Sequence, residues 1–122
     1  MATILVVDDS GYARRVLRQT LDPLGHTVVE AASGMAALEA YAVHHPHVVL
    51  LDLTMEDLGG LEVLARLREI DPAARVIVVS ADIQRSTGKQ VAEGGAFRFL
   101  PKPADPGDLV EAVNAALAAE AG

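Results

Sequence analysis

Short apolar runs alternate along this sequence with longer stretches of helical period. Five runs rich in Val, Ile, Leu or Phe predict strands, at Thr3–Val7, Val28–Glu30, Val48–Leu51, Arg75–Val79 and Phe97–Leu100. Each is followed by a segment whose apolar spacing predicts a helix. The third and fourth runs are apolar at nearly every position, as parallel strands are when helices cover both faces of their sheet. We therefore expect an α/β fold of five βα units, with a doubly wound parallel five-stranded sheet.

Capping residues and helix breakers set the ends of the expected helices. The first helix stops at Pro23–Gly25, because both residue types interrupt the helical pattern. The second, third and last helices begin after Ser33, at Gly59–Gly60 and at Asp105–Pro106. The fourth, about Gln84 to Glu93, contains serine, threonine and glycine, which are poor helix formers. We expect this helix to be mobile.

Composition narrows the class of protein. With 122 residues, 51% of them hydrophobic, the chain fits one compact domain over residues 1–122. It has no cysteine, which excludes disulfides and thiolate chemistry and favours a reducing, cytoplasmic location. Its apolar runs are too short to cross a membrane. A net charge of −7 opposes direct binding to nucleic acid, so we expect protein partners and no membrane insertion.

Polar residues gather where the predicted strands end. Asp8 and Asp9 follow the first strand and Asp52 follows the third, while Ser80 follows the fourth and Lys102 comes shortly after the fifth. Taken singly, each suits a cap, a turn or a solvated charge. Considered together, these residues lie at the edge of the sheet where open parallel sheets bind their ligands. Three carboxylates there would repel by about 3 kcal/mol per pair at ~5 Å with an effective dielectric near 20, so a cation such as Mg²⁺ is expected among them.

The motifs Asp8-Asp9, Asp52, Ser80-Ala81 and Lys102-Pro103, on five βα units, resemble those of a response-regulator receiver domain of two-component signalling. The resemblance covers almost the whole chain and is to the single-domain, chemotaxis-regulator type. It implies the flavodoxin-like strand order 2-1-3-4-5. It also implies a phosphoprotein, not an enzyme acting on other substrates, that takes a phosphoryl group from a histidine kinase or histidine phosphotransfer protein. Such a protein signals to a downstream protein target, as a monomer or a phosphorylation-dependent dimer.

The resemblance assigns Asp52 as the nucleophile and phosphorylation site. Asp9 would bind Mg²⁺ directly, Asp8 directly or through water, and the backbone carbonyl of Thr54 would complete the protein ligands together with Asp52. Carboxylate attack on phosphorus needs in-line access and neutralised charge. We therefore expect Asp52 to be open to solvent, and to be kept ionised by the metal and by Lys102.

Other residues are given roles around the phosphoryl group. The resemblance implies that Lys102 pairs with its oxygens, that Ser80 donates a hydrogen bond to it, and that the Lys102–Pro103 peptide is cis. Ser80 and Phe99 would form the switch, and the helix near 84–93, the strand at 97–100 and the last helix would form the output face. Thr54 and Asp82 occupy positions that tune phosphoryl lifetime in relatives. Glu56 stands where the family usually has proline, which should leave its loop less rigid.

Other functions remain as alternatives. An aspartate-nucleophile phosphatase of the haloacid-dehalogenase type would also use a strand-end aspartate and Mg²⁺, but it needs a second aspartate where Thr54 stands. A flavin-binding flavodoxin-like protein is disfavoured because the acidic pocket would repel the flavin phosphate. A receiver fragment of a larger regulator is a further alternative to the stand-alone receiver that we expect.

Two clusters have plainer interpretations. His44, His45 and His47 lie around Pro46, where neighbouring residues rarely converge on a tetrahedral site, so zinc is disfavoured. Three arginines of the first helix, Arg14, Arg15 and Arg18, form a basic strip that we expect to be a solvated face. The alternative is that this strip docks the phosphotransfer helices of a kinase.

Overall fold

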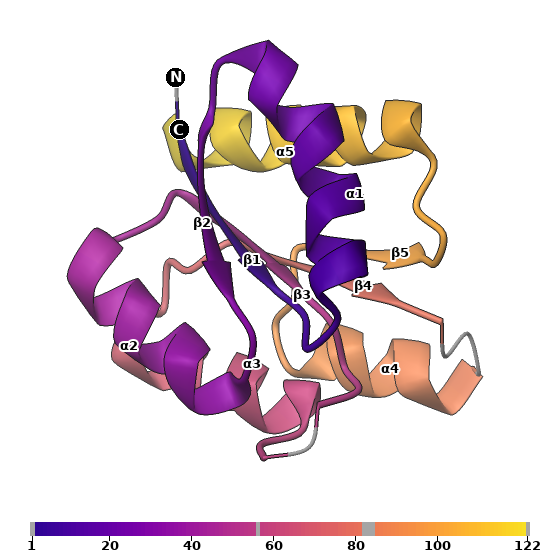
Figure 1. Ribbon diagram of the computed structural model, residues 1–122. Coiled ribbons are helices and arrows are strands. Elements are labelled where there is room, and N and C mark those ends of the chain that lie inside the picture. The colour runs from indigo at the N-terminus through magenta and orange to yellow at the C-terminus, as the bar shows by residue number, and fades with distance from the viewer. Residues whose placement is uncertain (1, 56, 82–84, 122) are drawn as a thin grey trace.

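The computed structural model describes residues 2–55, 57–81 and 85–121, in which strands and helices alternate as predicted (Figure 1). The strands are β1 (Thr3–Val7), β2 (Thr27–Ala31), β3 (Val48–Leu51), β4 (Val76–Ser80) and β5 (Arg98–Pro101). The helices are α1 (Gly11–Leu21), the 3₁₀ turn Asp22–Leu24, α2 (Gly34–His44), α3 (Gly60–Ile70), α4 (Arg85–Glu93) and α5 (Pro106–Ala121). The predicted β4 and β5 each lie one residue too early, and the observed β4 includes Ser80.

The strands form one parallel five-stranded sheet in the order β2-β1-β3-β4-β5, which confirms the predicted topology. Figure 1 shows α1 and α5 on one face of the sheet and α2, α3 and α4 on the other. Alternate strand residues point to opposite faces, and each face is apolar. Thus Ile4, Val6 and Leu50 pack under α1 and α5, whereas Leu5, Val7 and Leu51 pack under the other three helices.

Helix starts are fixed by side chains that accept hydrogen bonds from free backbone amides. Ser33 accepts from the amide of Ala36 at 3.1 Å, and Asp105 accepts from the amide of Asp108 at 3.1 Å, so both predicted caps are confirmed. An unexpected cap also serves α2, from a distant loop. Each carboxylate oxygen of Asp57 accepts from a backbone amide, one from Gly34 and one from Met35, both at 3.0 Å. Asp57 therefore ties the β3–α3 loop to the start of α2.

We expect Asp57→Ala to lower the melting temperature at neutral pH and to do so less as the solution is acidified. The hydrogen bonds from Met35, Gly34 and Leu58 lower the pKa of Asp57 from 3.8 to about 2. A carboxylate with a lowered pKa stabilises the fold above its ordinary pKa, and that contribution is lost as pH falls from 3.8 towards 2. Melting temperatures of the wild type and of Asp57→Ala, recorded from pH 7 down to pH 3, measure this contribution. Glu69→Ala, on the exposed side of α3, is the control, and an equal deficit at every pH would contradict the assignment.

No helix within the described residues is both long and apolar enough to cross a lipid bilayer.

Candidate functional site

The sheet register brings two of the predicted aspartates side by side. β1 and β3 are neighbours, with Val7 opposite Leu51, so the residues that follow them, Asp8 and Asp52, emerge together at the carboxyl edge. The Asp52 amide continues the ladder by donating to the carbonyl of Val7 at 3.0 Å. Asp9, next along the chain, is exposed at the start of the loop to α1. One carboxylate oxygen from each of the three aspartates lies within 4.8 Å of the others.

Lys102 supplies a positive charge to this acidic group. Its Nζ lies 2.6 Å from Asp8 Oδ2 and 3.3 Å from Asp52 Oδ1, and its side chain is 25% exposed. The Lys102 amide donates to the carbonyl of Ser80 at 2.9 Å, which holds the lysine backbone against the end of β4. The peptide bond between Lys102 and Pro103 is cis, as the resemblance implies. The structure therefore brings the lysine, Asp8 and Asp52 into contact.

Asp52 is less open to solvent than expected. The residue is 5% exposed, so the expectation of an open nucleophile is wrong. Burial raises the pKa of Asp52, and the charge of Lys102, which lowers it, does not outweigh the combined effect of burial and Asp8. Burial lowers the pKa of Lys102, but its hydrogen bond to Asp8 and the nearby charges prevail, and the pKa is raised. Lys102 alone thus leaves Asp52 easier to protonate than a free aspartate.

The remaining predicted residues surround this centre at different depths. Ser80 is fully buried at the end of β4. Thr54 is exposed, and its backbone amide acts to lower the pKa of the Asp52 carboxyl, an effect that was not anticipated. Phe99 is partly buried against the cluster under α2, α3 and α4. Asp82 and Glu56 lie outside the described residues.

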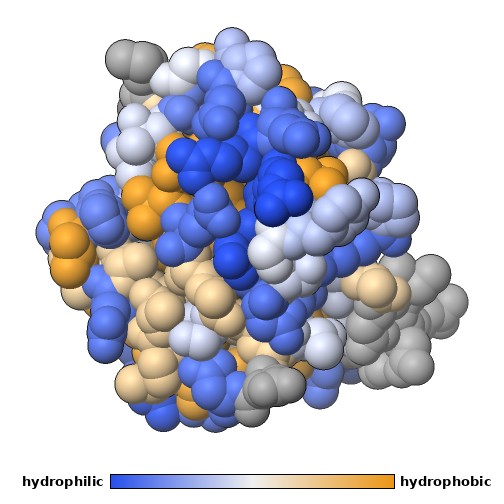
Figure 2. Space-filling view, in the orientation of Figure 1, coloured by the Kyte–Doolittle hydropathy of each residue, from blue (hydrophilic) through white to orange (hydrophobic). Residues whose placement is uncertain are grey.

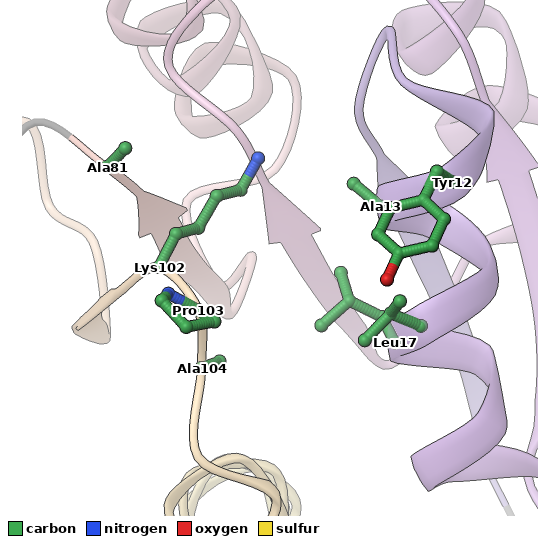
Figure 3. A pocket seen from close by; sticks show the side chains of 8 residues that line it. Tyr12, Ala13, Leu17, Ala81, Lys102, Pro103 and Ala104 are labelled. Atoms are coloured by element: carbon green, nitrogen blue, oxygen red, sulfur yellow. The ribbon is translucent and has the colours of Figure 1, made fainter.

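A cavity of about 360 Å³ opens beside the lysine, between α1 and the segment from Lys102 to Ala104. Figure 3 shows the Lys102 side chain extending past Ala81 on one side, with Tyr12 and Leu17 of α1 across the gap. Tyr12 is 73% exposed, so it does not pack in the core. Ala81 is exposed at this opening.

The expected solvated strip on α1 is wrong for Arg14, whose side chain is 18% exposed, whereas the side chain of Arg18 remains 42% exposed. Arg14 Nε lies 2.8 Å from Glu30 Oε1, and Arg18 Nη1 lies 2.6 Å from Glu30 Oε2. Arg15 is exposed. The four-residue spacing of Arg14 and Arg18 places them on one face of the helix, over β2. The four-residue spacing and the glutamate in β2 were the only sequence signs of these ion pairs. Predicting the pairs would also require knowing how α1 is placed on the sheet, which the sequence does not give.

Among the predicted histidines, His47 accepts a hydrogen bond at Nδ1 from the Thr3 amide at 3.0 Å, and His45 ends α2 in the left-handed region with φ of 47°. These are local structural roles at the edge of the sheet opposite to the aspartates.

The donor set fits a hard divalent cation. Carboxylate oxygens are the ligands that Mg²⁺ prefers, usually few in number and completed by carbonyl, water or phosphate oxygen. Asp8, Asp9 and Asp52 offer three such groups within reach of one ion, and Lys102 balances only one of their charges. Asp9 is exposed to solvent, whereas Asp8 and Asp52 are buried.

Comparison with known proteins gives one consistent family. The model for the response regulator receiver domain matches residues 4–114. The chain is 35% identical to the chemotaxis protein CheY of Thermotoga maritima, over 91% of this chain and 93% of that protein. It is 40% identical to the DNA-binding transcriptional regulator NtrC of Azospirillum brasilense, over 95% of this chain but 24% of that protein.

Solved structures agree with this result. A CheY-like receiver domain protein from Methanospirillum hungatei superposes with a TM-score of 0.94, at 25% identity, covering 99% of this chain and 97% of the other. CheY from Borrelia burgdorferi, in a complex with CheX, BeF₃ and Mg²⁺, gives a TM-score of 0.88 at 32% identity, with 93% and 87% covered. By sequence and by fold, the chain belongs to the response-regulator receiver family of two-component signalling.

Proposed function

We propose that residues 1–122 are a phosphoacceptor receiver domain in which Asp52 takes a phosphoryl group from the phosphohistidine of a histidine kinase or histidine phosphotransfer protein. The observation that carries this proposal is the contact of Asp52 with Lys102 at 3.3 Å, beside two further carboxylates within 4.8 Å. The domain catalyses only its own phosphorylation and dephosphorylation. We place it in the cytoplasm, acting on a downstream protein without direct contact to nucleic acid.

The proposed reaction is a transfer between two nucleophiles. A carboxylate oxygen of Asp52 attacks the phosphorus, the new O–P bond forms as the N–P bond to the histidine breaks, and the released imidazole takes up a proton. Lys102 already contacts Asp52 and would pair with the phosphoryl oxygens. Mg²⁺, held by Asp8, Asp9, Asp52 and the Thr54 carbonyl, would neutralise charge on the transferring group. The CheY complex with BeF₃ and Mg²⁺ among the structural relatives supports this assignment.

We further propose that phosphorylation is read at the face formed by α4, β5 and α5. Ser80 ends β4 and would donate a hydrogen bond to the phosphoryl group. Phe99 lies opposite Val78 in the adjacent strand, and its ring is near Gly88 of α4, at 3.9 Å from the position of a Cβ there. Phe99 has no hydroxyl, so a change in its position would be a change of packing. Thr54, exposed beside Asp52, and Asp82 are proposed to tune the phosphoryl lifetime.

The experiment is incubation with a small acyl phosphate and Mg²⁺, followed by intact mass measurement. We expect the wild type to gain the mass of one phosphoryl group and Asp52→Asn to gain none. Asp57→Asn, in the same loop, is the matched control and should be labelled like the wild type, because Asp57 faces the α2 amides. Labelling of Asp52→Asn, or repeated turnover of unrelated phosphate esters by the wild type, would overturn the proposal, the second in favour of a phosphatase.

A further inference from the structure

Arg14 joins the edge of the sheet to the backbone of the acidic loop. Its Nε lies 2.8 Å from Glu30 Oε1, and its Nη1 donates to the carbonyl oxygen of Asp8. The side chain is only 18% exposed. In Figure 2 the most hydrophilic side chains on this face gather over α1 and the neighbouring edge of β2. Arg14 thus connects three elements: β2, α1 and the loop that carries the aspartates.

The guanidinium is held in place from its outer side. Glu30 lies in β2 opposite Val6 of β1, and it binds both Arg14 and Arg18, the latter at 2.6 Å. These two arginines lower the pKa of Glu30, which keeps its carboxylate ionised. A planar guanidinium held through one edge presents its other N–H groups in a fixed direction. Here that direction is the Asp8 carbonyl.

The carbonyl that Arg14 binds belongs to the peptide between Asp8 and Asp9. The Asp8 side chain has its own restraints, from Lys102 and from the Ser10 amide at 2.9 Å. For Asp9 the situation differs, since its carboxylate makes no hydrogen bond or ion pair within the described residues. Among the described residues, therefore, only the backbone limits where the Asp9 carboxylate can reach. Arg14 is the side chain that holds the peptide preceding it.

We propose that Arg14 is a positioning residue for the metal site: it fixes the Asp8–Asp9 peptide so that the Asp9 carboxylate stands ready beside Asp8 and Asp52. This inference rests on the proposed function, in which Asp9 binds Mg²⁺. Arg14 itself contributes no ligand. Groups that orient metal ligands typically change affinity by 10- to 100-fold when they are removed. Because Arg14 acts through a backbone carbonyl, we expect the lower end of that range.

The test measures Mg²⁺ binding directly, by following amide chemical shifts of the whole chain in a MgCl₂ titration without phosphoryl donor. Arg14→Gln should weaken Mg²⁺ affinity by about tenfold. Arg15→Gln, which removes the same charge from the exposed neighbouring position, should change it by less than about twofold. Arg14→Lys keeps the charge but not the planar fork, so we expect it to resemble Arg14→Gln. Affinity equal to wild type in Arg14→Lys would show that charge alone matters and would overturn the proposal.

A second variant tests the route through Glu30. Glu30→Gln should weaken Mg²⁺ binding in the same direction, and Arg14→Gln with Glu30→Gln should be no weaker than Arg14→Gln alone, because both changes break one chain of contacts. If all variants lose melting temperature but bind Mg²⁺ like the wild type, Arg14 is merely structural and the inference fails. In that outcome the proposed function survives. If the wild type binds no Mg²⁺, the metal assignment and this inference fail together.

Discussion

Gly60→Ala should lower the free energy of unfolding by about 3 kcal/mol, near the upper end of what overpacking costs. A Cβ at Gly60 would lie 2.5 Å from the carbonyl oxygen of Asp52 and 2.5 Å from the Cα of Leu53. Both are backbone atoms, so no side chain can rotate away to relieve the contact. The start of α3 must then move off the strand end. Since that strand end carries Asp52, we also expect slower phosphoryl transfer from a small donor.

The neighbouring glycine provides a matched control. A Cβ at Gly59 has no atom within 4 Å, so Gly59→Ala should cost less than about 1 kcal/mol, the ordinary effect of alanine at a helix N-cap. Urea unfolding of the wild type, Gly60→Ala and Gly59→Ala gives the two changes in the free energy of unfolding. Intact mass measurement over time gives the rate of phosphoryl transfer. Equal stability of the two variants would show that the close approach of α3 to Asp52 is not maintained in solution.

Lys102→Met should destabilise the protein at neutral pH in a metal-free buffer by about 2 kcal/mol. Removing one partner of a buried ion pair usually costs 3–5 kcal/mol, and the 25% exposure of the Lys102 side chain reduces this. Asp8 and Asp52, 1% and 5% exposed, would be left facing one another without the ammonium. Removing the Lys102 ammonium would also remove the main interaction that lowers the pKa of Asp52, so that pKa should rise further.

The dependence on pH has a definite sign. A carboxyl whose folded pKa is raised loses stability as pH rises from its ordinary value of 3.8 to the folded value. The deficit of Lys102→Met should therefore be greatest near pH 7 and shrink towards pH 4, and MgCl₂ should raise its melting temperature more than that of the wild type. Lys89→Met is the control, because Lys89 is the other lysine of the chain and its side chain is 79% exposed. A deficit that is independent of both pH and Mg²⁺ would indicate lost packing instead of lost charge.

The arrangement of the acidic group could be predicted because it depends on where strands end. The apolar run Val48–Leu51 matches β3 to the residue, and the alternation of runs and helices fixes a parallel sheet. Carboxylates that follow neighbouring strands must then meet at one edge. Small errors in strand ends, as at β4, do not disturb this result.

Two of the features that were missed join residues far apart in sequence, through surfaces whose register no local pattern gives. Asp57 caps amides that lie 22 and 23 residues earlier, and Arg14 binds a glutamate 16 residues away. The burial of Asp52 has a similar origin, because it depends on how closely Lys102 and the loop approach. Periodicity identifies which face of an element is buried, but it does not give the distance between two packed elements.

The cap that Asp57 provides for α2 gives the molecule a built-in spectroscopic reporter. The amides of Gly34 and Met35 should exchange with solvent deuterium when their hydrogen bonds to the Asp57 carboxylate break. Asp57 is five residues along the chain from Asp52. Their exchange rates would therefore register a displacement of Asp57, on the side of the sheet far from α5.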